Sequence, residues 1–168
     1  MTRERLSAFG FVYVALAMPA FALGFDHPRA DAALFTGATF AFLWFLASLR
    51  SRLVKFDPDG FFASVVMMGG AACISLQTVL LLFGRTELAA PAAGCEAVLV
   101  IGSSLAALRA RKVPKPFGRA GVAGGIAIGI VGAVEGAANW TLAGHTVFGA
   151  TVGFMVWVIV TTTYLLRH

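Results

Sequence analysis

Six long apolar runs joined by short connections constrain the fold of this 168-residue chain more than any other feature. About twenty helical residues cross a hydrocarbon core of about 30 Å, and each run is close to that length. Only 12% of the residues are charged, against about a quarter in soluble domains. The sequence therefore predicts an all-α, polytopic membrane helix bundle that forms one transmembrane domain over residues 1–168. The predicted helices cover residues 6–25, 32–49, 60–84, 88–108, 120–139 and 145–166.

The beginning of the chain also has the basic start and apolar run of a secretory signal peptide. Residues 6–25 are long enough to span a membrane, and no small-x-small cleavage site is followed by a soluble domain. We therefore predict a first transmembrane helix here and keep a cleaved signal peptide as the alternative.

Basic residues occupy alternate connections between the predicted helices. Lys and Arg are concentrated in the loops that stay in the cytoplasm, so this alternation predicts six spans with both termini in the cytoplasm of a bacterial inner (plasma) membrane. Five or seven spans would mix the basic loops. The charges thus determine topology and contact membrane lipid, and we expect no nucleic acid partner. One side holds Arg3, Arg5, Arg50, Arg52, Lys55, Arg109, Arg111, Lys112, Lys115, Arg119 and Arg167; the other holds Arg29 and Arg85.

Glycines recur at four-residue intervals in the fifth predicted helix. Gly in an exposed helix costs about 1 kcal/mol relative to Ala, but small-xxx-small spacing lets two helix backbones approach closely inside a bilayer. This pattern predicts close helix packing at Gly121, Gly125, Gly129, Gly132 and Gly136.

Two acidic residues, Glu96 and Glu135, lie within the predicted spans. A charge at the centre of a membrane helix costs about 2.5 to 3.5 kcal/mol, so such residues usually face the bundle interior or a wet cavity. The helical rise of about 1.5 Å per residue places both, with Gln77, in the outer half of the membrane. We hypothesise one polar cavity open to the outside, lined by Gln77, Glu96, Glu135, Asn139 and His145. Alternatively, each protonated glutamate hydrogen-bonds a neighbouring helix and has only a structural role.

Three local features predict details of the connections and the thiols. Asp59 is placed to cap the helix over 60–84, and the prolines in 109–119 favour an extended connector. Residues 26–31 read as a turn. Cys73 and Cys95 lie in apolar runs and are expected to be buried free thiols.

We expect no cofactor and no metal centre. The two cysteines lack CxxC spacing, and no second histidine lies within a span to pair with His145 in a bis-histidine haem site. Nucleophile-elbow, zinc-protease, Walker and dinucleotide motifs are absent from the sequence.

The segments FLWFLASLRSRLVKFDPDGFFASVVMMGGAA at 42–72 and GFMVWVIVTTTYLLRH at 153–168 resemble an uncharacterised family of small six-helix actinobacterial integral membrane proteins. The resemblance implies the fold and the membrane location only. Within the chain, GATFAF at 37–42 is similar to GATVGF at 149–154, which suggests a repeat of the terminal hairpins, although short apolar sequences also match by chance.

Three functions follow from these features. The first is a non-catalytic accessory or assembly subunit that packs against other membrane protein subunits in a larger complex of transporter or respiratory type. The second is a small proton-coupled transporter or channel that uses Glu96 and Glu135. The third is an intramembrane enzyme that acts on a lipid or an isoprenoid with a carboxylate as general acid.

Overall fold

The computed structural model describes residues 8–23, 28–55, 57, 59–83, 88–111, 113–137 and 143–167. Over these residues the fold is all-helical, as predicted, with one helix in each of the six predicted regions. The helices are α2 (Phe9–Leu23), α3 (Pro28–Leu53), α4 (Phe61–Phe83), α5 (Ala89–Arg109), α6 (Lys115–Ala137) and α7 (Ala143–Arg167).

Four of the helices have the length and hydropathy of a membrane span, which marks the chain as a membrane protein. These spans cover 32–53, 61–80, 89–109 and 115–134. Helices α2 and α7 contribute shorter apolar stretches in the part of the chain that the structure describes, at 9–20 and 150–164.

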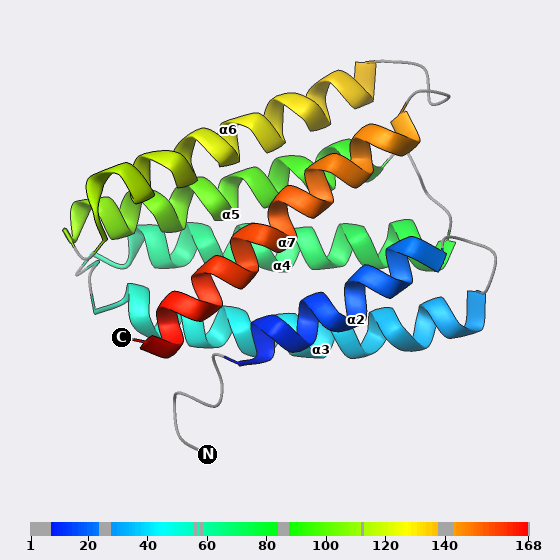
Figure 1. Ribbon diagram of the computed structural model, residues 1–168, viewed down its shortest axis with the longest axis horizontal. Helices are drawn as coiled ribbons and strands as arrows, with labels where there is room; N and C mark the ends of the chain where they lie inside the picture. Colours follow the sequence, from blue (N-terminus) through cyan, green and yellow to red (C-terminus); the bar gives the residue numbers. More distant parts are fainter. Residues whose placement is uncertain are drawn as a thin grey trace.

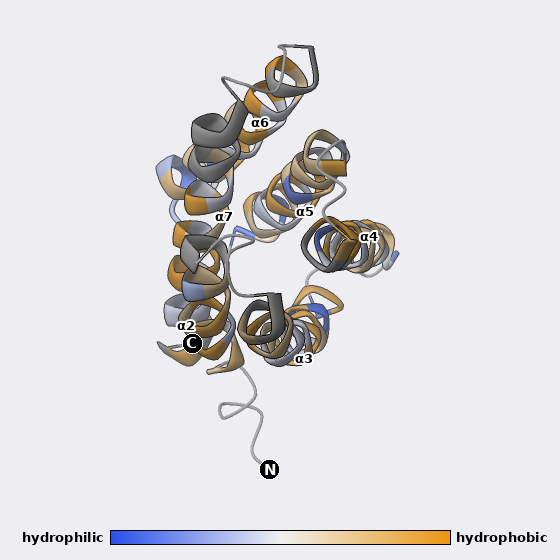
Figure 2. Ribbon diagram, turned by 90° about the vertical axis from the view of Figure 1, so that its right-hand side faces the viewer, coloured by the Kyte–Doolittle hydropathy of each residue, from blue (hydrophilic) through white to orange (hydrophobic). Residues whose placement is uncertain are grey.

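Helices that follow one another in the chain pack side by side with alternating direction (Figure 1). Seen from the end of the bundle, they form a ring in chain order, which closes where α7 lies beside α2 (Figure 2). Helix α7 crosses the bundle obliquely, and it contacts α5 and α6 as well as α2. The ring therefore brings the two ends of the sequence together.

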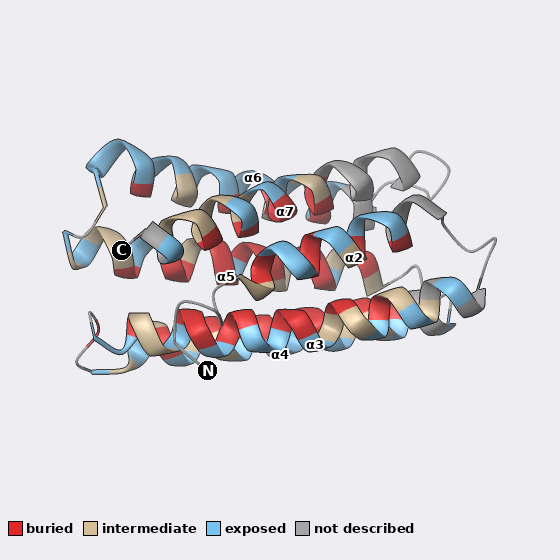
Figure 3. Ribbon diagram, turned by 60° about the horizontal axis from the view of Figure 1, so that its bottom comes forward, coloured by how far each residue is buried: buried red, intermediate tan, exposed pale blue. Residues whose placement is uncertain are grey.

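An aromatic cluster joins α2, α3 and α7 in the buried interior. The Tyr13 and Phe42 rings are 4.8 Å apart between centroids, Phe42 and Phe154 are 5.9 Å apart, and Phe154 stacks on Trp157 at 5.8 Å. Such ring pairs contribute about 0.5 to 1.5 kcal/mol beyond their burial. Helix α3 turns a continuous buried face toward this cluster, whereas α6 is mainly exposed (Figure 3).

Helix α6 packs against α5 through its glycines. A Cβ added to Gly125 would lie 2.6 Å from Ile101 Cγ1 and 3.2 Å from the Ala97 carbonyl oxygen, so only glycine allows this approach. The Gly136 backbone belongs to α6, and its surroundings fall outside the description. The contacts that define the register pair Gly121 with Ser104, Gly125 with Ile101, Gly129 with Ala97 and Gly132 with Ala93.

Two connections are shorter than predicted because proline begins a helix instead of preventing one. Helix α6 starts at Lys115, with Pro116 in its first turn, so the extended connector predicted over 109–119 is wrong beyond that point. Helix α3 starts at Pro28, inside the predicted turn. Proline suits these positions because the first amide groups of a helix have no intrahelical acceptor to lose.

The predicted cap of α4 is also wrong, because Asp57 takes the place expected for Asp59. The Ala63 backbone amide donates to Asp57 Oδ2 at 3.1 Å, and Asp57 is buried. Gly60, with a φ of 67°, turns the chain between this aspartate and the helix. Asp59 is exposed instead, and its Oδ2 lies 3.8 Å from an Arg109 guanidinium nitrogen. This ion pair connects the α3–α4 turn to the end of α5.

Candidate functional site

A buried polar pair joins α4 to α5. Gln77 Nε2 donates a hydrogen bond to Glu96 Oε1 at 2.5 Å, and the two residues are 3% and 2% exposed. Two of the five residues predicted to form a polar cavity are therefore in direct contact. Glu96 lies on the side of α5 that faces α4, while Ala93 and Ala97 face the glycines of α6.

Tyr13 brings a third helix to this pair, and sequence reasoning missed it. Its hydroxyl lies in the surroundings of Cys73, Glu96 and Gln77. Tyr13 is fully buried, and neither its hydroxyl nor Gln77 Oε1 has a hydrogen-bond partner among the residues described. A tyrosine within an apolar helix was the available signal, since a buried phenol usually requires a polar neighbour.

The structure describes the other three predicted site residues only in part. Glu135 lies in α6 and His145 in α7, but their side chains, and all of Asn139, fall outside the described part. The α5–α6 register sets Gly129 opposite Ala97, so the Glu135 backbone lies about 8 Å farther along the bundle than the level of Glu96. A cavity shared by the two glutamates remains a prediction.

The thiols differ in their burial. Cys73 is buried next to the polar pair, as expected, whereas Cys95 is partly exposed and that expectation is wrong. Both are free. Across the described positions, no three His, Cys, Asp or Glu side chains meet in an arrangement that could hold a metal ion.

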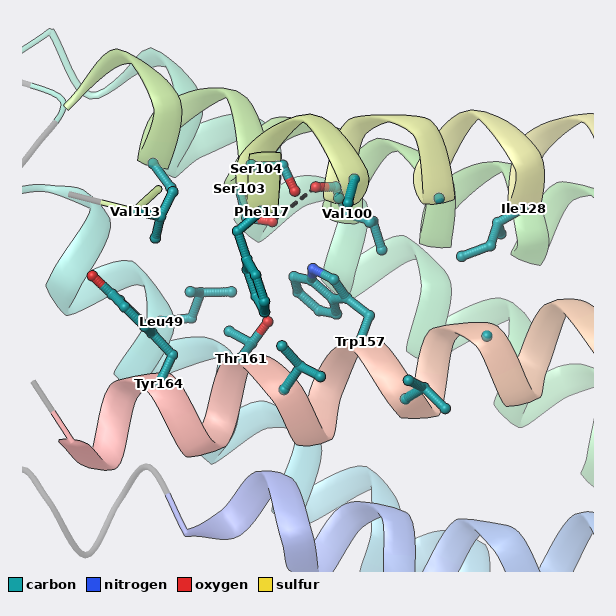
Figure 4. A pocket seen from close by; sticks show the side chains of 18 of the residues that line it. Leu49, Val100, Ser103, Ser104, Val113, Phe117, Ile128, Trp157, Thr161 and Tyr164 are labelled. Atoms are coloured by element: carbon teal, nitrogen blue, oxygen red, sulfur yellow. Dashed lines mark hydrogen bonds between the residues drawn. The ribbon is translucent and has the colours of Figure 1, made fainter. Parts of the chain in front are cut away.

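A cavity of about 660 Å³ lies elsewhere in the bundle, between α3, α5, α6 and α7. Figure 4 shows the Trp157, Phe117 and Tyr164 side chains projecting toward one shared space. Its walls are mainly apolar, and the volume falls within the range of about 300 to 1,000 Å³ that is usual for ligand pockets. The polar residues on its walls are Arg52, Ser103, Ser104, Thr161 and Tyr164.

The cavity is long and follows the helix axes. On α7 its wall runs from Ala150 to Tyr164, which corresponds to about 21 Å of helix. Arg52 and Tyr164 mark one end, beside the α3–α4 and α5–α6 turns. Val131 and Ala150 mark the other end, near the level of Glu96.

The space exists because small residues leave it unfilled. A Cβ added to Gly124 would meet nothing within 4 Å, and one added to Gly153 would reach only Ile128 Cγ1 at 3.9 Å. Both glycines line the cavity, together with Ala127 and Ala150. The glycines of α6 thus have two surroundings, since Gly125 and Gly132 pack against α5 while Gly124 borders unfilled space in the cavity.

Aromatic side chains separate the cavity from the buried polar pair. Neither Gln77 nor Glu96 lines the cavity, although Val100, one helical turn from Glu96 on α5, does. Trp157 forms part of the cavity wall and stacks on Phe154, whose ring centroid is 6.3 Å from that of Tyr13. The predicted polar residues and the observed cavity are therefore neighbouring but distinct features.

The fold and the cavity define a helical membrane protein with a mainly apolar, partly open cavity between its helices. Comparisons with protein-family models, with curated proteins and with solved structures find no match to this chain.

Proposed function

We propose that this chain is a non-catalytic, multi-pass membrane protein that binds the apolar chain of a membrane amphiphile. The observation that supports this function is the cavity of about 660 Å³, whose walls are mainly apolar and whose polar side chains include Arg52 and Tyr164 at one end. Water finds few hydrogen-bond partners in such a space, whereas a hydrocarbon chain would make favourable van der Waals contacts along its walls.

The proposed topology has six spans and places both termini in the cytoplasm of a bacterial plasma membrane. In support, the α3–α4 and α5–α6 turns, the start of α2 and the end of α7 lie at the same end of the bundle (Figure 1). That end carries most of the basic residues, in agreement with the cytoplasmic preference of Lys and Arg. The test introduces Lys55→Cys or Arg111→Cys into a protein whose Cys73 and Cys95 have been replaced. A membrane-impermeant maleimide should fail to label either introduced cysteine in intact cells and should label both after permeabilisation.

A role as an accessory subunit is a weaker proposal, because the glycine pattern of α6 is explained by packing within the chain and does not require a partner subunit. The glycine pattern that predicted close helix packing is used within the chain, where Gly125, Gly129 and Gly132 pack against α5. The resemblance to small actinobacterial membrane proteins likewise remains a proposal about ancestry.

The buried polar pair favours a second candidate function, a small proton-coupled transporter. Gln77 Nε2 contacts a carboxylate that is 2% exposed, and buried acidic residues in membrane proteins often carry protons. Purified protein in liposomes should then dissipate a pH gradient, and Glu96→Gln should abolish this flux. Equal flux in the variant and the wild type would rule out Glu96 as the proton carrier.

Filling the cavity tests the main proposal. Gly124→Leu places a side chain in the cavity, and its Cβ would meet no atom within 4 Å. Gly94→Leu is a matched control. Its Cβ would also meet no atom within 4 Å, but Gly94 does not line the cavity. The probe is phosphatidylglycerol with a diazirine on one acyl chain, incorporated into liposomes. Wild type and Gly94→Leu should crosslink at cavity residues of α6 and α7, and Gly124→Leu should lose at least fivefold of this signal. Equal crosslinking in all three proteins would refute the proposal.

A further inference from the structure

We infer that the bound chain belongs to a bilayer lipid and enters the cavity sideways, through an opening between α6 and α7, while the lipid headgroup stays outside the bundle. This inference rests on the proposed function and specifies the source and class of its ligand. Three observations carry it, namely the paths of the two helices, the unequal exposure of the cavity walls and the chemistry of the exposed wall.

Helices α6 and α7 approach each other at one level of the cavity and separate beyond it. A Cβ added to Gly153 of α7 would lie 3.9 Å from Ile128 Cγ1 of α6, so the two helices are close at this point. Farther along α7, Thr162 lies against Gly10 of α2, whereas Gly121 of α6 still packs against α5. The two helices therefore diverge toward the end of the bundle that holds the α5–α6 turn (Figure 1).

The cavity walls differ in exposure between the two sides. Helices α3 and α5 contribute buried lining residues, among them Leu49 at 4% and Val100 at 1% exposed. On the other side, Phe117 of α6 is 56% exposed and Val156 of α7 is 53% exposed. Large exposed fractions on this side alone indicate that the cavity opens where α6 and α7 diverge.

The opening faces the hydrocarbon of the membrane. Residues 115–134 of α6 form one of the four spans, and residues 150–164 of α7 form an apolar stretch. The exposed lining residues of these two helices have apolar side chains or none, so a lipid headgroup would lose its hydration in passing them and gain no hydrogen bond. An acyl chain can pass without this cost. These residues are Phe117, Ala120, Gly124, Ala127, Gly153 and Val156.

Trp157 can report which phase reaches the cavity, because it forms part of the wall. Trp44→Phe and Trp140→Phe leave it as the single tryptophan of the chain. This parent protein is reconstituted into phosphatidylcholine vesicles that carry bromine atoms in the middle of an acyl chain, or into unlabelled vesicles with acrylamide in the water. The brominated chain should quench Trp157 fluorescence at least twofold, and acrylamide should give less than half of that quenching.

Matched variants and a second headgroup complete the test. In the parent protein, Gly124→Leu should remove at least half of the quenching by the brominated chain, and Gly94→Leu should leave it unchanged, because Gly94 does not line the cavity. Brominated phosphatidylglycerol and phosphatidylcholine should quench equally within twofold, because the headgroup stays outside. Circular dichroism and gel filtration establish that the variants are folded.

The outcomes separate the inference from the proposed function. Acrylamide quenching above half of the lipid quenching would mean that the cavity opens to water, and a larger than twofold difference between the two headgroups would mean that the headgroup is bound. Either result overturns the inference, while loss of crosslinking in Gly124→Leu would still support the proposed function. If the brominated chain quenches Gly124→Leu as strongly as its parent, the chain lies outside the cavity, and the proposed function fails as well.

Discussion

Packing between α5 and α6 can be tested with a single methyl group. Gly125→Ala would place its Cβ 2.6 Å from Ile101 Cγ1, and 3.2 Å from both the Ala97 carbonyl oxygen and the Ile101 amide nitrogen. The isoleucine side chain can rotate, but the two backbone atoms can move away only if the helices separate. Overpacking of this kind costs about 1 to 3 kcal/mol.

Gly94→Ala on α5 supplies the reference, because its added Cβ meets nothing within 4 Å. Alanine improves helix propensity by up to about 1 kcal/mol at both positions, so this contribution cancels in the comparison. Gly125→Ala should therefore be less stable than Gly94→Ala by about 1 to 3 kcal/mol, or roughly 5- to 150-fold in the unfolding constant.

The assay is reversible unfolding in mixed micelles, in which sodium dodecyl sulfate is titrated into protein in a mild detergent and helix content is followed by circular dichroism. The free energies of unfolding of the two variants are compared at one detergent composition. A difference below about 0.5 kcal/mol would refute the inference that α6 approaches α5 closely at this glycine.

The same unfolding assay tests three other features. Asp57→Ala should lower the free energy of unfolding by about 0.5 to 2 kcal/mol, because it removes the acceptor for an α4 backbone amide. Asp59→Ala should lower it by less than about 1 kcal/mol, because its ion pair is exposed. Equal losses in the two variants would contradict the assignment of Asp57 as the cap. A double-mutant cycle of Gln77→Leu and Glu96→Leu should give a coupling energy of about 0.6 to 1.7 kcal/mol. The absence of measurable coupling would mean that the buried hydrogen bond does not contribute to stability. Tyr13→Phe should stay within about 0.5 kcal/mol of the wild type, since the hydroxyl has no hydrogen-bond partner of good geometry among the residues described; a loss above about 1 kcal/mol would show that the hydroxyl is bonded.

The helices were predictable from the sequence because hydropathy and length are local properties. The ends of α4 and α5 lie within one residue of the predicted bounds. The errors at α3 and α6 arose where a proline was read as a break although it occupies the first turn. Capping was misjudged for a related reason, since the turn at Gly60 decides which aspartate reaches the α4 amides.

The site was less predictable because it depends on which helix faces meet. Helical depth placed Gln77 and Glu96 at similar levels, and the structure brings them into contact. Depth could not include Tyr13, because its helix is far from α4 and α5 in sequence and only the tertiary fold brings its side chain near the buried pair. The cavity was not predicted either, since its lining residues read as ordinary small and apolar positions on four separate helices.

By itself, the sequence determined the helical membrane class and the approximate position of each helix, because backbone hydrogen bonding and apolar length decide these segment by segment. Only the tertiary structure decided how the glycines of α6 are used. Gly125 meets the α5 backbone, whereas Gly124, its immediate neighbour, opens onto an unfilled space. The physical reason is that adjacent residues on a helix point about 100° apart, so the same residue type forms a contact or a cavity according to the helix it faces.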